Sequence, residues 1–186
     1  MSRSPALRDH IAAGILDIAA GVLADRGEAA SMVDIADAAG VGRATLYRYF
    51  PNREALVRAL YETALTDLAA RITDAQLDSV PVAEAVARLT RAVIAATSKY
   101  RALGLFTKTL DESRQADRDL FEPFRALFHR AAAEGALRTD VPVDTLVAIY
   151  VGLLEGTIAR VIGGRLGIEQ ASGAVTAVFL TGALHH

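Results

Sequence analysis

The stretch Ser31 to Leu56 reads SMVDIADAAGVGRATLYRYFPNREAL, and it decides the fold of the N-terminal part of the chain. Two short amphipathic segments meet in it across Ala39-Gly40-Val41. A helix-turn-helix needs a small residue where its helices cross, a residue tolerant of unusual dihedral angles in the turn, and an apolar anchor on the second helix. Ala36, Gly40 and Leu46 supply these three in turn. The spacing therefore predicts a helix-turn-helix.

Local signals predict where these two helices begin and end. The Ser31 hydroxyl can cap free backbone N–H groups at the start of the first helix, and Asp34, three residues later, completes a capping box. Gly40 is expected to end that helix, and the second is expected from Arg43 to Phe50. The small core beneath the pair is expected to contain Ile35, Ala39 and Phe50.

The second helix is expected to have one buried and one exposed face. If Leu46 and Phe50 point inward, the helical period turns the intervening positions outward, where a major groove of DNA has room for a helix. These outward residues are Arg43, Ala44, Tyr47 and Arg48. Tyr47 and Tyr49 also have a second interpretation, in which their rings cover the edge of the core as amphipathic side chains do.

Positive charge is concentrated around this helix. Residues 41–58 contain four arginines and one glutamate, a net charge of +3, whereas the whole chain has a net charge of −2, which leaves −5 for the remainder. The four arginines are Arg43, Arg48, Arg53 and Arg58, and Arg3 and Arg8 add positive charge near the N-terminus. A solvated basic face is the alternative, but the coincidence of charge with helix-turn-helix spacing favours one face directed at a polyanion.

The composition of the whole chain limits the remaining possibilities. With 186 residues, the chain is long enough for one domain or two small ones and for a core without disulfide support. Hydrophobic residues make up 52% and charged residues 23%, which is typical of a globular protein. Cysteine is absent from the sequence, which excludes disulfides, thiol catalysis and cysteine-based metal centres.

Apolar residues recur at helical spacing along nearly the whole sequence, and this predicts an all-α fold. The first helix is expected from Pro5 to Arg26, with its buried stripe formed by Ile11, Ile15, Ile18 and Val22 beside Leu16, Ala19 and Leu23. A long fourth helix follows Pro51-Asn52, with its buried face formed by Leu56, Leu60, Ala64, Leu68 and Ile72. It is expected to join the two halves of the molecule.

About nine helices are expected in total. After a turn at residues 78–81, a fifth helix should bury Val86, Leu89, Val93 and Ala96. The later elements are expected as a short helix at Leu103–Leu110, a solvated loop at Asp111–Asp119, a helix ended by Gly135 with Pro123 in its first turn or at a kink, a helix from Pro142 to about Gly163 or Gly164, and a last helix at Glu169–Ala183.

Other classes of protein find little support in the sequence. No signal peptide is expected, and the most apolar stretch, Leu146 to Leu154, is too short to span a membrane. The sequence has no glycine-rich phosphate loop, no HExxH and no GxSxG, and its four histidines are too scattered for a metal-binding motif. We therefore expect no catalytic residues, no metal and no cofactor.

With these motifs, the sequence resembles the tetracycline-repressor (TetR) family of bacterial transcription regulators. The resemblance covers about residues 8–60 by motif and rests on Ile35-Ala36, Ala39-Gly40-Val41, Thr45-Leu46-Tyr47, Tyr49-Phe50 and Arg53-Glu54-Ala55-Leu56. It implies a helix-turn-helix DNA-binding domain at residues 1–52 and a helical regulatory domain at residues 53–186. It also implies a cytoplasmic homodimer, in general a repressor, that binds a palindromic operator and is released by a small-molecule effector whose identity the sequence does not give.

The resemblance also assigns roles to residues of the DNA-binding segment. Arg43 and Ala44 stand where the family reads bases, by an arginine paired with guanine and an alanine methyl against a thymine methyl. The positions implied to contact phosphates are Thr45, Tyr49 and Arg53, with Ser31 as an addition. Tyr47 is implied to pack against base or sugar edges, and Arg48 to contact a base or a phosphate. Gly42 and Arg53 depart from the family's usual serine and lysine.

In the regulatory half, the resemblance implies a ligand cavity and a dimer interface. The ligand-binding candidates are Tyr100, Phe106, Phe121, Phe124, Phe128 and Tyr150, although any one aromatic residue at helical spacing is more often part of a core. The dimer-interface candidates are Ala148, Gly152, Gly156, Ala174 and Val178. Small residues four apart allow close helix approach, which serves tight packing within one chain as well as between two.

Two other functions remain open from the sequence. One is an enzyme or carrier built on a helical bundle, in which the basic segment is incidental and duplex DNA is not bound. The other keeps DNA binding but has no effector, so that the bundle serves only to dimerise or to bind a partner protein. Turnover or cargo binding would favour the first, and DNA binding that no compound changes would favour the second.

Overall fold

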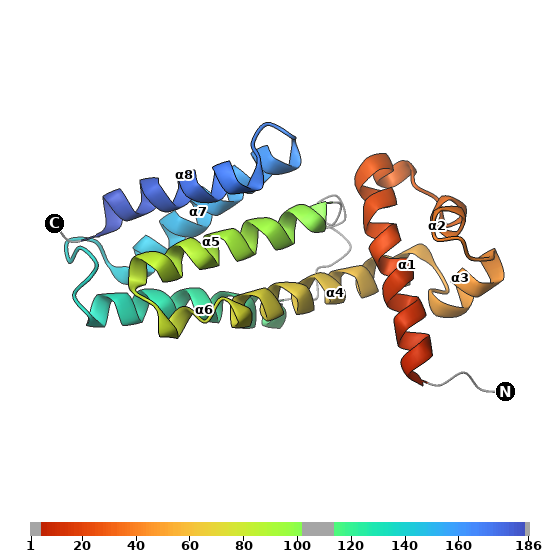
Figure 1. The fold of residues 1–186 in the computed structure, drawn as a ribbon, viewed down its shortest axis with the longest axis horizontal. Helices are drawn as coiled ribbons and strands as arrows, with labels where there is room; N and C mark the ends of the chain where they lie inside the picture. The colour runs from red at the N-terminus through yellow and green to blue at the C-terminus, as the bar shows by residue number, and fades with distance from the viewer. Residues whose placement is uncertain (1–4, 102–113, 185–186) are drawn as a thin grey trace. The chain divides into compact units, whose positions relative to one another are not determined.

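The computed structural model describes residues 5–101 and 114–184, and this part of the chain is all-helical, as expected. Eight α-helices and two short 3-10 segments, η1 and η2, occur in these residues (Figure 1). The α-helices are α1 Pro5–Arg26, α2 Met32–Ala38, α3 Arg43–Tyr49, α4 Arg53–Asp74, α5 Val82–Lys99, α6 Arg114–Ala133, α7 Val143–Ile162 and α8 Ile168–Ala183, with η1 at Gly27–Ala29 and η2 at Leu77–Ser79. The expected short helix at Leu103–Leu110 lies outside the described residues.

The described residues form two compact units, and α4 continues from the first into the second. The first unit contains residues 5–64 with Tyr100 and Arg101, and the second contains residues 65–99 and 114–184. The division falls inside α4, between Ala64 and Leu65. A functional boundary at residues 52–53 stays a prediction.

The first unit is built on α1, which packs against α2, and α2 packs against α3. Its core contains the apolar side chains that the sequence predicts for α2, α3 and the start of α4, including Ile35, Leu46 and Leu60. The prediction for Ile18 was wrong, because 41% of its surface is exposed. The buried arc of α1 is centred on Ala19, and Ile18 falls beyond its edge, since successive helical residues are separated by about 100°.

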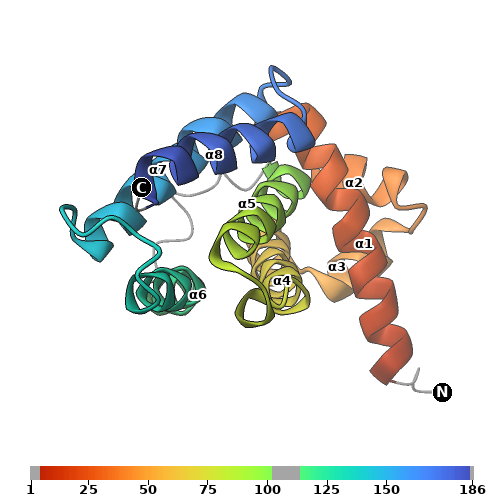
Figure 2. The same cartoon turned by 60° about the vertical axis from the view of Figure 1, so that its left-hand side comes forward.

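The second unit is a bundle around α5, which packs against α6, α7 and α8. Figure 2 shows α7 and α8 side by side, and both pack against α5. The residues predicted to face inward from α5 are buried, namely Val86, Leu89, Val93 and Ala96. This unit therefore has its own core, separate in its side chains from the core of the first unit.

One expectation around α6 needs correction. The stretch Asp111–Asp119 was expected as a loop, but α6 already begins at Arg114. Charged and polar residues such as arginine and glutamine are good helix formers, so polarity alone does not break a helix. Pro123 consequently lies inside α6 rather than in its first turn. Gly135, with a φ of +70°, follows the end of this helix, as predicted.

By length and composition, α7 could cross a membrane, with a mean hydropathy of 1.6. The apolar stretch is longer than the nine residues expected, because Glu155 interrupts it without ending it. In the structure α7 buries one face in the bundle, through Leu146, Tyr150 and Leu154. Core helices of globular proteins meet the same criteria of length and composition, so α7 by itself does not indicate a membrane protein.

Candidate nucleic-acid interface

The turn between α2 and α3 has the conformation that the sequence predicts. Gly40 has a φ of +64°, in the left-handed region that favours glycine. The N–H of Gly40 donates to the Asp37 carbonyl at 3.2 Å, and the N–H of Val41 donates to the Ala36 carbonyl at 3.0 Å. Ala36 and Leu46 are fully buried, so the crossing has the small residue and the apolar anchor that it needs.

The first residues of α2 are also held as predicted. The N–H of Asp34 donates to the Ser31 hydroxyl oxygen at 3.1 Å, and the N–H of Ser31 donates to the Asp34 carboxylate at 2.8 Å. These two bonds form the capping box. The start of α2, and with it the helix-turn-helix, is therefore fixed by local side-chain chemistry.

Helix α3 directs its polar residues away from the core. Arg43, Ala44 and Arg48 are exposed, and Tyr47 has 46% of its surface exposed. Among the contacts of the described residues, neither Arg43 nor Arg48 has a carboxylate partner. Because no described carboxylate pairs with either charge, this face is positively charged within the described residues. The predicted DNA-reading residues thus share one exposed face.

Tyr49 and Thr45 lie at the margin of this face, both half-buried. The Arg48 guanidinium lies over the Tyr49 ring, 5.5 Å from its centroid. The Tyr49 ring is also 6.4 Å from the ring of Phe50, which is buried in the core. Tyr49 therefore covers the core edge and supports Arg48, while the predicted phosphate contacts of Thr45 and Tyr49 stay predictions.

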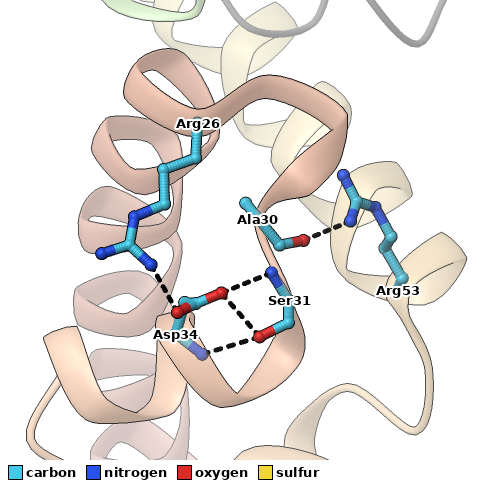
Figure 3. Close-up of polar contacts among 5 residues, drawn as sticks. All are labelled: Arg26, Ala30, Ser31, Asp34 and Arg53. Atoms are coloured by element: carbon cyan, nitrogen blue, oxygen red, sulfur yellow. Dashed lines mark hydrogen bonds and ion pairs between the residues drawn. The ribbon is translucent and has the colours of Figure 1, made fainter.

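Ser31 donates its hydroxyl proton inside the protein. The hydroxyl donates to the Asp34 carboxylate at 2.6 Å, and the Arg26 guanidinium pairs with the other oxygen of that carboxylate (Figure 3). The hydroxyl and N–H of Ser31, followed by the charge of Arg26, hold the pKa of Asp34 below its usual value. A phosphate contact by the Ser31 hydroxyl would require its proton to leave Asp34, so that role stays a prediction.

Arg53, at the start of α4, bonds to the backbone that links α1 to α2. Its Nη1 donates to the carbonyl of Ala30 (Figure 3) and to the carbonyl of Glu28 at 3.1 Å, and its Nη2 donates to the carbonyl of Gly27 at 3.3 Å. The side chain is partly buried there. The structure thus gives Arg53 at least three acceptors within the protein, and its predicted phosphate contact stays a prediction.

Two residues of this region were not singled out by sequence reasoning. Arg26 pairs with Asp34, eight residues later, across the junction of α1 and α2, a contact that no helix-capping or i,i+4 pattern predicts. Asn52 caps α4, since its side-chain oxygen accepts from the Ala55 N–H at 2.7 Å. An asparagine just before a helix is a recognised capping signal, so this second contact could have been found from the sequence.

In the second unit, three of the predicted ligand-binding aromatic residues form one cluster. The Tyr150 ring lies 5.3 Å from Phe128 and 6.0 Å from Phe124, measured between centroids. Phe179 of α8 completes the cluster at 5.1 Å from Tyr150, a member that sequence reasoning missed. All four side chains are buried, so the cluster forms the centre of the bundle core.

The cluster contains one polar contact. The hydroxyl groups of Tyr150 and Thr90 are 2.8 Å apart, and both side chains are fully buried. Burial raises the pKa of Tyr150 far above its ordinary value, because an ionised phenol would lose its solvation there. Tyr100 packs instead in the core of the first unit. Phe106 and the side chain of Phe121 lie outside the described residues.

Helices α7 and α8 each leave one face of small and apolar residues uncovered. Of the dimer-interface candidates, Gly156 is half-buried and the others are exposed, namely Ala148, Gly152, Ala174 and Val178. Val178 has 63% of its surface exposed, and Ile149, one turn before Gly152, has 50%. Such exposure costs solvation free energy in an isolated chain and is typical of a surface that meets a partner.

A small hollow lies where the end of α4 and η2 meet α6. Its volume is about 330 Å³, and it is lined by Ile72, Thr73, Gln76, Leu77, Asp78, Ser79, Pro123, Ala126 and Leu127. Among the described ligand-binding candidates, Tyr100, Phe124, Phe128 and Tyr150 do not line it. Within the described ranges, no three His, Asp or Glu side chains gather in a way that could hold a metal ion.

Comparison with protein families gives one match over the helix-turn-helix. Residues 15–60 match the family model described as bacterial regulatory proteins, tetR family. This range contains most of α1, all of α2 and α3, and the start of α4, including the capping box, the Gly40 turn and the exposed arginines.

Comparison with known proteins extends the likeness over most of the chain. The chain is 30% identical to the HTH-type transcriptional repressor KstR2 of Rhodococcus jostii over 143 residues, which are 70% of this chain and 69% of that protein. It is 45% identical to the repressor LfrR of Mycolicibacterium smegmatis over 82 residues, 44% of this chain and 43% of that protein. The crystal structure of LfrR in complex with proflavine superposes with a TM-score of 0.73 at 25% identity, covering 97% and 99% of the two chains.

Proposed function

Since the chain belongs to the TetR family of bacterial transcription regulators, we propose that it represses transcription as a homodimer bound to a palindromic operator. Membership places it among DNA-binding regulators rather than enzymes, and repressors occur among its relatives. The proposal has three further parts. It states which residues read the operator, that the chain forms a homodimer, and that a small molecule controls it. A cytoplasmic location follows from the same role.

The observation that carries the proposal is the exposed face of α3. Arg43 and Arg48 present guanidinium groups without carboxylate partners in the described residues, beside the small side chain of Ala44. In a major groove, a guanidinium can donate two parallel hydrogen bonds to guanine, and an alanine methyl can contact the methyl of thymine. Tyr47 contributes ring contacts with base or sugar edges. We assign sequence readout to this face.

Backbone contacts position the helix without reading the sequence. We assign such contacts to Thr45 and Tyr49 at the margin of α3, where a hydroxyl group can reach a phosphate. Ser31 and Arg53 were expected to contribute in the same way. Both donate hydrogen bonds within the protein, so a phosphate would have to compete with those partners.

The homodimer is proposed to form through α7 and α8. These helices pack side by side, and each exposes small residues that allow a second copy to approach closely. The apolar side chains of Ile149 and Val178 supply surface to bury. Two-fold symmetry then requires two operator half-sites, and recognition helices in successive major grooves are about 34–36 Å apart.

An effector is proposed to bind in the second unit. The described residues assigned to its binding are Phe124, Phe128 and Tyr150. The LfrR structure contains proflavine, which supports small-molecule control in this chain as well. The cluster is closely packed, so an effector would have to displace some of its contacts. The energy available to release DNA cannot exceed the difference in effector affinity between the two states.

Selection of bound sequences from a random duplex pool tests this proposal. The expected result is enrichment of an inverted repeat whose half-sites are separated by about one helical turn. A pool that shows no enrichment over repeated rounds would contradict the proposed function. If enrichment occurs and no compound in a broad screen releases the DNA, the effector part of the proposal is wrong and a purely DNA-binding dimer remains.

A further inference from the structure

Arg53 holds together the two ends of the helix-turn-helix. The motif begins at Ser31, the cap of α2, and ends at Asn52, the cap of α4. The Arg53 side chain donates to the carbonyl of Ala30, the residue just before the motif, while Arg53 itself is the residue just after it (Figure 3). These bonds therefore connect the two ends of the helix-turn-helix, at residues 30 and 53.

The acceptors suit a guanidinium for physical reasons. The carbonyls of Gly27 and Glu28 lie just beyond the end of α1, where the helix dipole places partial negative charge. A guanidinium is a planar fork of donors that can bond to several oxygens in fixed directions. A lysine ammonium has the same charge but presents it from a single flexible point.

A second arginine holds the other 3-10 segment in a similar way. In the second unit, Arg130 of α6 donates to the carbonyl of Leu77 in η2 at 2.8 Å and to the carbonyl of Val80 at 3.5 Å. Both arginines therefore join a helix to backbone carbonyls of a short 3-10 turn. Only the Arg53 contact closes on the helix-turn-helix, so Arg130 provides a matched control.

We propose that Arg53 is a positioning residue, which sets the orientation of α2 and α3 for DNA binding through its bonds to the carbonyls of Gly27, Glu28 and Ala30. Its contribution to operator affinity comes through the placement of α3 and not through a phosphate contact of its own. This inference rests on the proposed function, because its readout is operator binding.

The test compares Arg53→Lys, Arg53→Gln and Arg130→Lys with the wild-type chain. The probe is the duplex that the wild-type chain enriches most from a random pool, and affinity is measured at several salt concentrations, well below the melting temperature of each variant. A positioning role predicts that both Arg53 variants bind about tenfold more weakly, with a salt slope unchanged within about 0.3 of wild type. Arg130→Lys should lose thermal stability and keep its affinity.

Hydrogen exchange of the free protein provides a second measurement. Loss of the Arg53 bonds should speed the exchange of backbone amides in residues 27–38 of Arg53→Lys, because the start of α2 is then less restrained. The same amides should be unaffected in Arg130→Lys. Equal exchange in wild type and Arg53→Lys would contradict the proposal without any use of DNA.

Two binding results would also overturn it. If Arg53→Lys binds like wild type while Arg53→Gln lowers the salt slope by about one, Arg53 is a phosphate contact. If both Arg53 variants melt earlier but bind the duplex normally when folded, the role is structural only. Failure of the wild-type chain to enrich any duplex is a separate outcome, because it contradicts the proposed function while hydrogen exchange still tests the Arg53 bonds.

Discussion

The two units each expose one surface that folding does not require, and the two surfaces differ in chemistry. The face of α3 presents Arg43 and Arg48, charges that no carboxylate in the described residues neutralises. The faces of α7 and α8 present glycine, alanine, Ile149 and Val178, with Glu155 of α7 as an exposed charge among them. A positively charged surface suits a polyanion, and a surface of small and apolar residues suits close approach of another helix. We therefore propose DNA as the partner of the α3 face and a second copy of the chain as the partner of the faces of α7 and α8.

The largest effect is expected at the apolar surface. Ile149→Lys combined with Val178→Lys should give a monomer, because burying two ammonium groups at an interface is unfavourable. Operator affinity should then fall by at least about 100-fold, since one monomer holds a single half-site. Light scattering and operator titration measure both effects. Thr73→Lys, an exposed position on α4, is the control for added charge and should stay dimeric.

A dimeric double variant would show that α7 and α8 do not form the interface, and the small residues would then serve packing within the chain. A monomer that keeps full operator affinity would instead separate dimerisation from DNA binding. Either result would contradict the proposal that dimerisation through α7 and α8 is needed for operator binding by α3.

The next effect is expected on the basic surface. Arg43→Ala should cost about 1–3 kcal/mol of binding free energy at the selected operator and relax the preference for one base in each half-site. Because Arg43 is exposed, the free energy of unfolding should change by less than about 0.5 kcal/mol. Titration of a panel of single-base operator variants checks the first point, and denaturant unfolding checks the second. A uniform loss across the panel would show that Arg43 contacts phosphate instead.

A smaller effect, on stability rather than contact, is expected at Ser31. Ser31→Ala removes the cap of α2 and should lower the free energy of unfolding by about 1 kcal/mol, within the range measured for such caps. The salt slope of operator binding should stay unchanged, because the hydroxyl donates to Asp34 in the protein. Denaturant unfolding and a salt series test the two statements. A slope lowered by about one, with stability unchanged, would assign Ser31 to the DNA contact.

The smallest effect is expected on stability at low pH, where Asp34 becomes protonated. The pKa of Asp34 lies below its ordinary value of 3.8 in the folded chain, so its ionised form stabilises the fold above that pH, and this contribution is lost as the pH falls through the folded pKa. The difference in urea midpoint between wild type and Asp34→Asn should therefore be present at pH 7 and shrink toward pH 3. A difference that grows toward pH 3 would contradict the lowered pKa.

Local signals allowed much of the first unit to be predicted. The capping box of Ser31 and Asp34 and the positive φ of Gly40 depend on residues within a few positions of each other. The local sequence is therefore enough to predict both features. The outward face of α3 follows from helical period once Leu46 is placed inside. Ile18 shows the limit, because its exposure depends on where the neighbouring helices stop covering α1.

Contacts between distant residues could not be predicted in the same way. The acceptors of Arg53 are backbone carbonyls, which have no identity in the sequence, and Phe179 joins the aromatic cluster only because α8 packs in the bundle. A count of arginines therefore predicts a basic surface but does not distinguish Arg43, which is exposed, from Arg53, which is bonded within the protein.

The central claim is that the exposed arginines of α3 read duplex DNA. The most direct test is a parallel titration of the selected operator and a shuffled duplex of equal composition, with the wild-type chain and with Arg43→Ala combined with Arg48→Ala. The account predicts that wild type prefers the operator by about 1,000-fold or more and that the double variant loses most of that preference while remaining folded. Equal preference in the two proteins, or none in wild type, would contradict it.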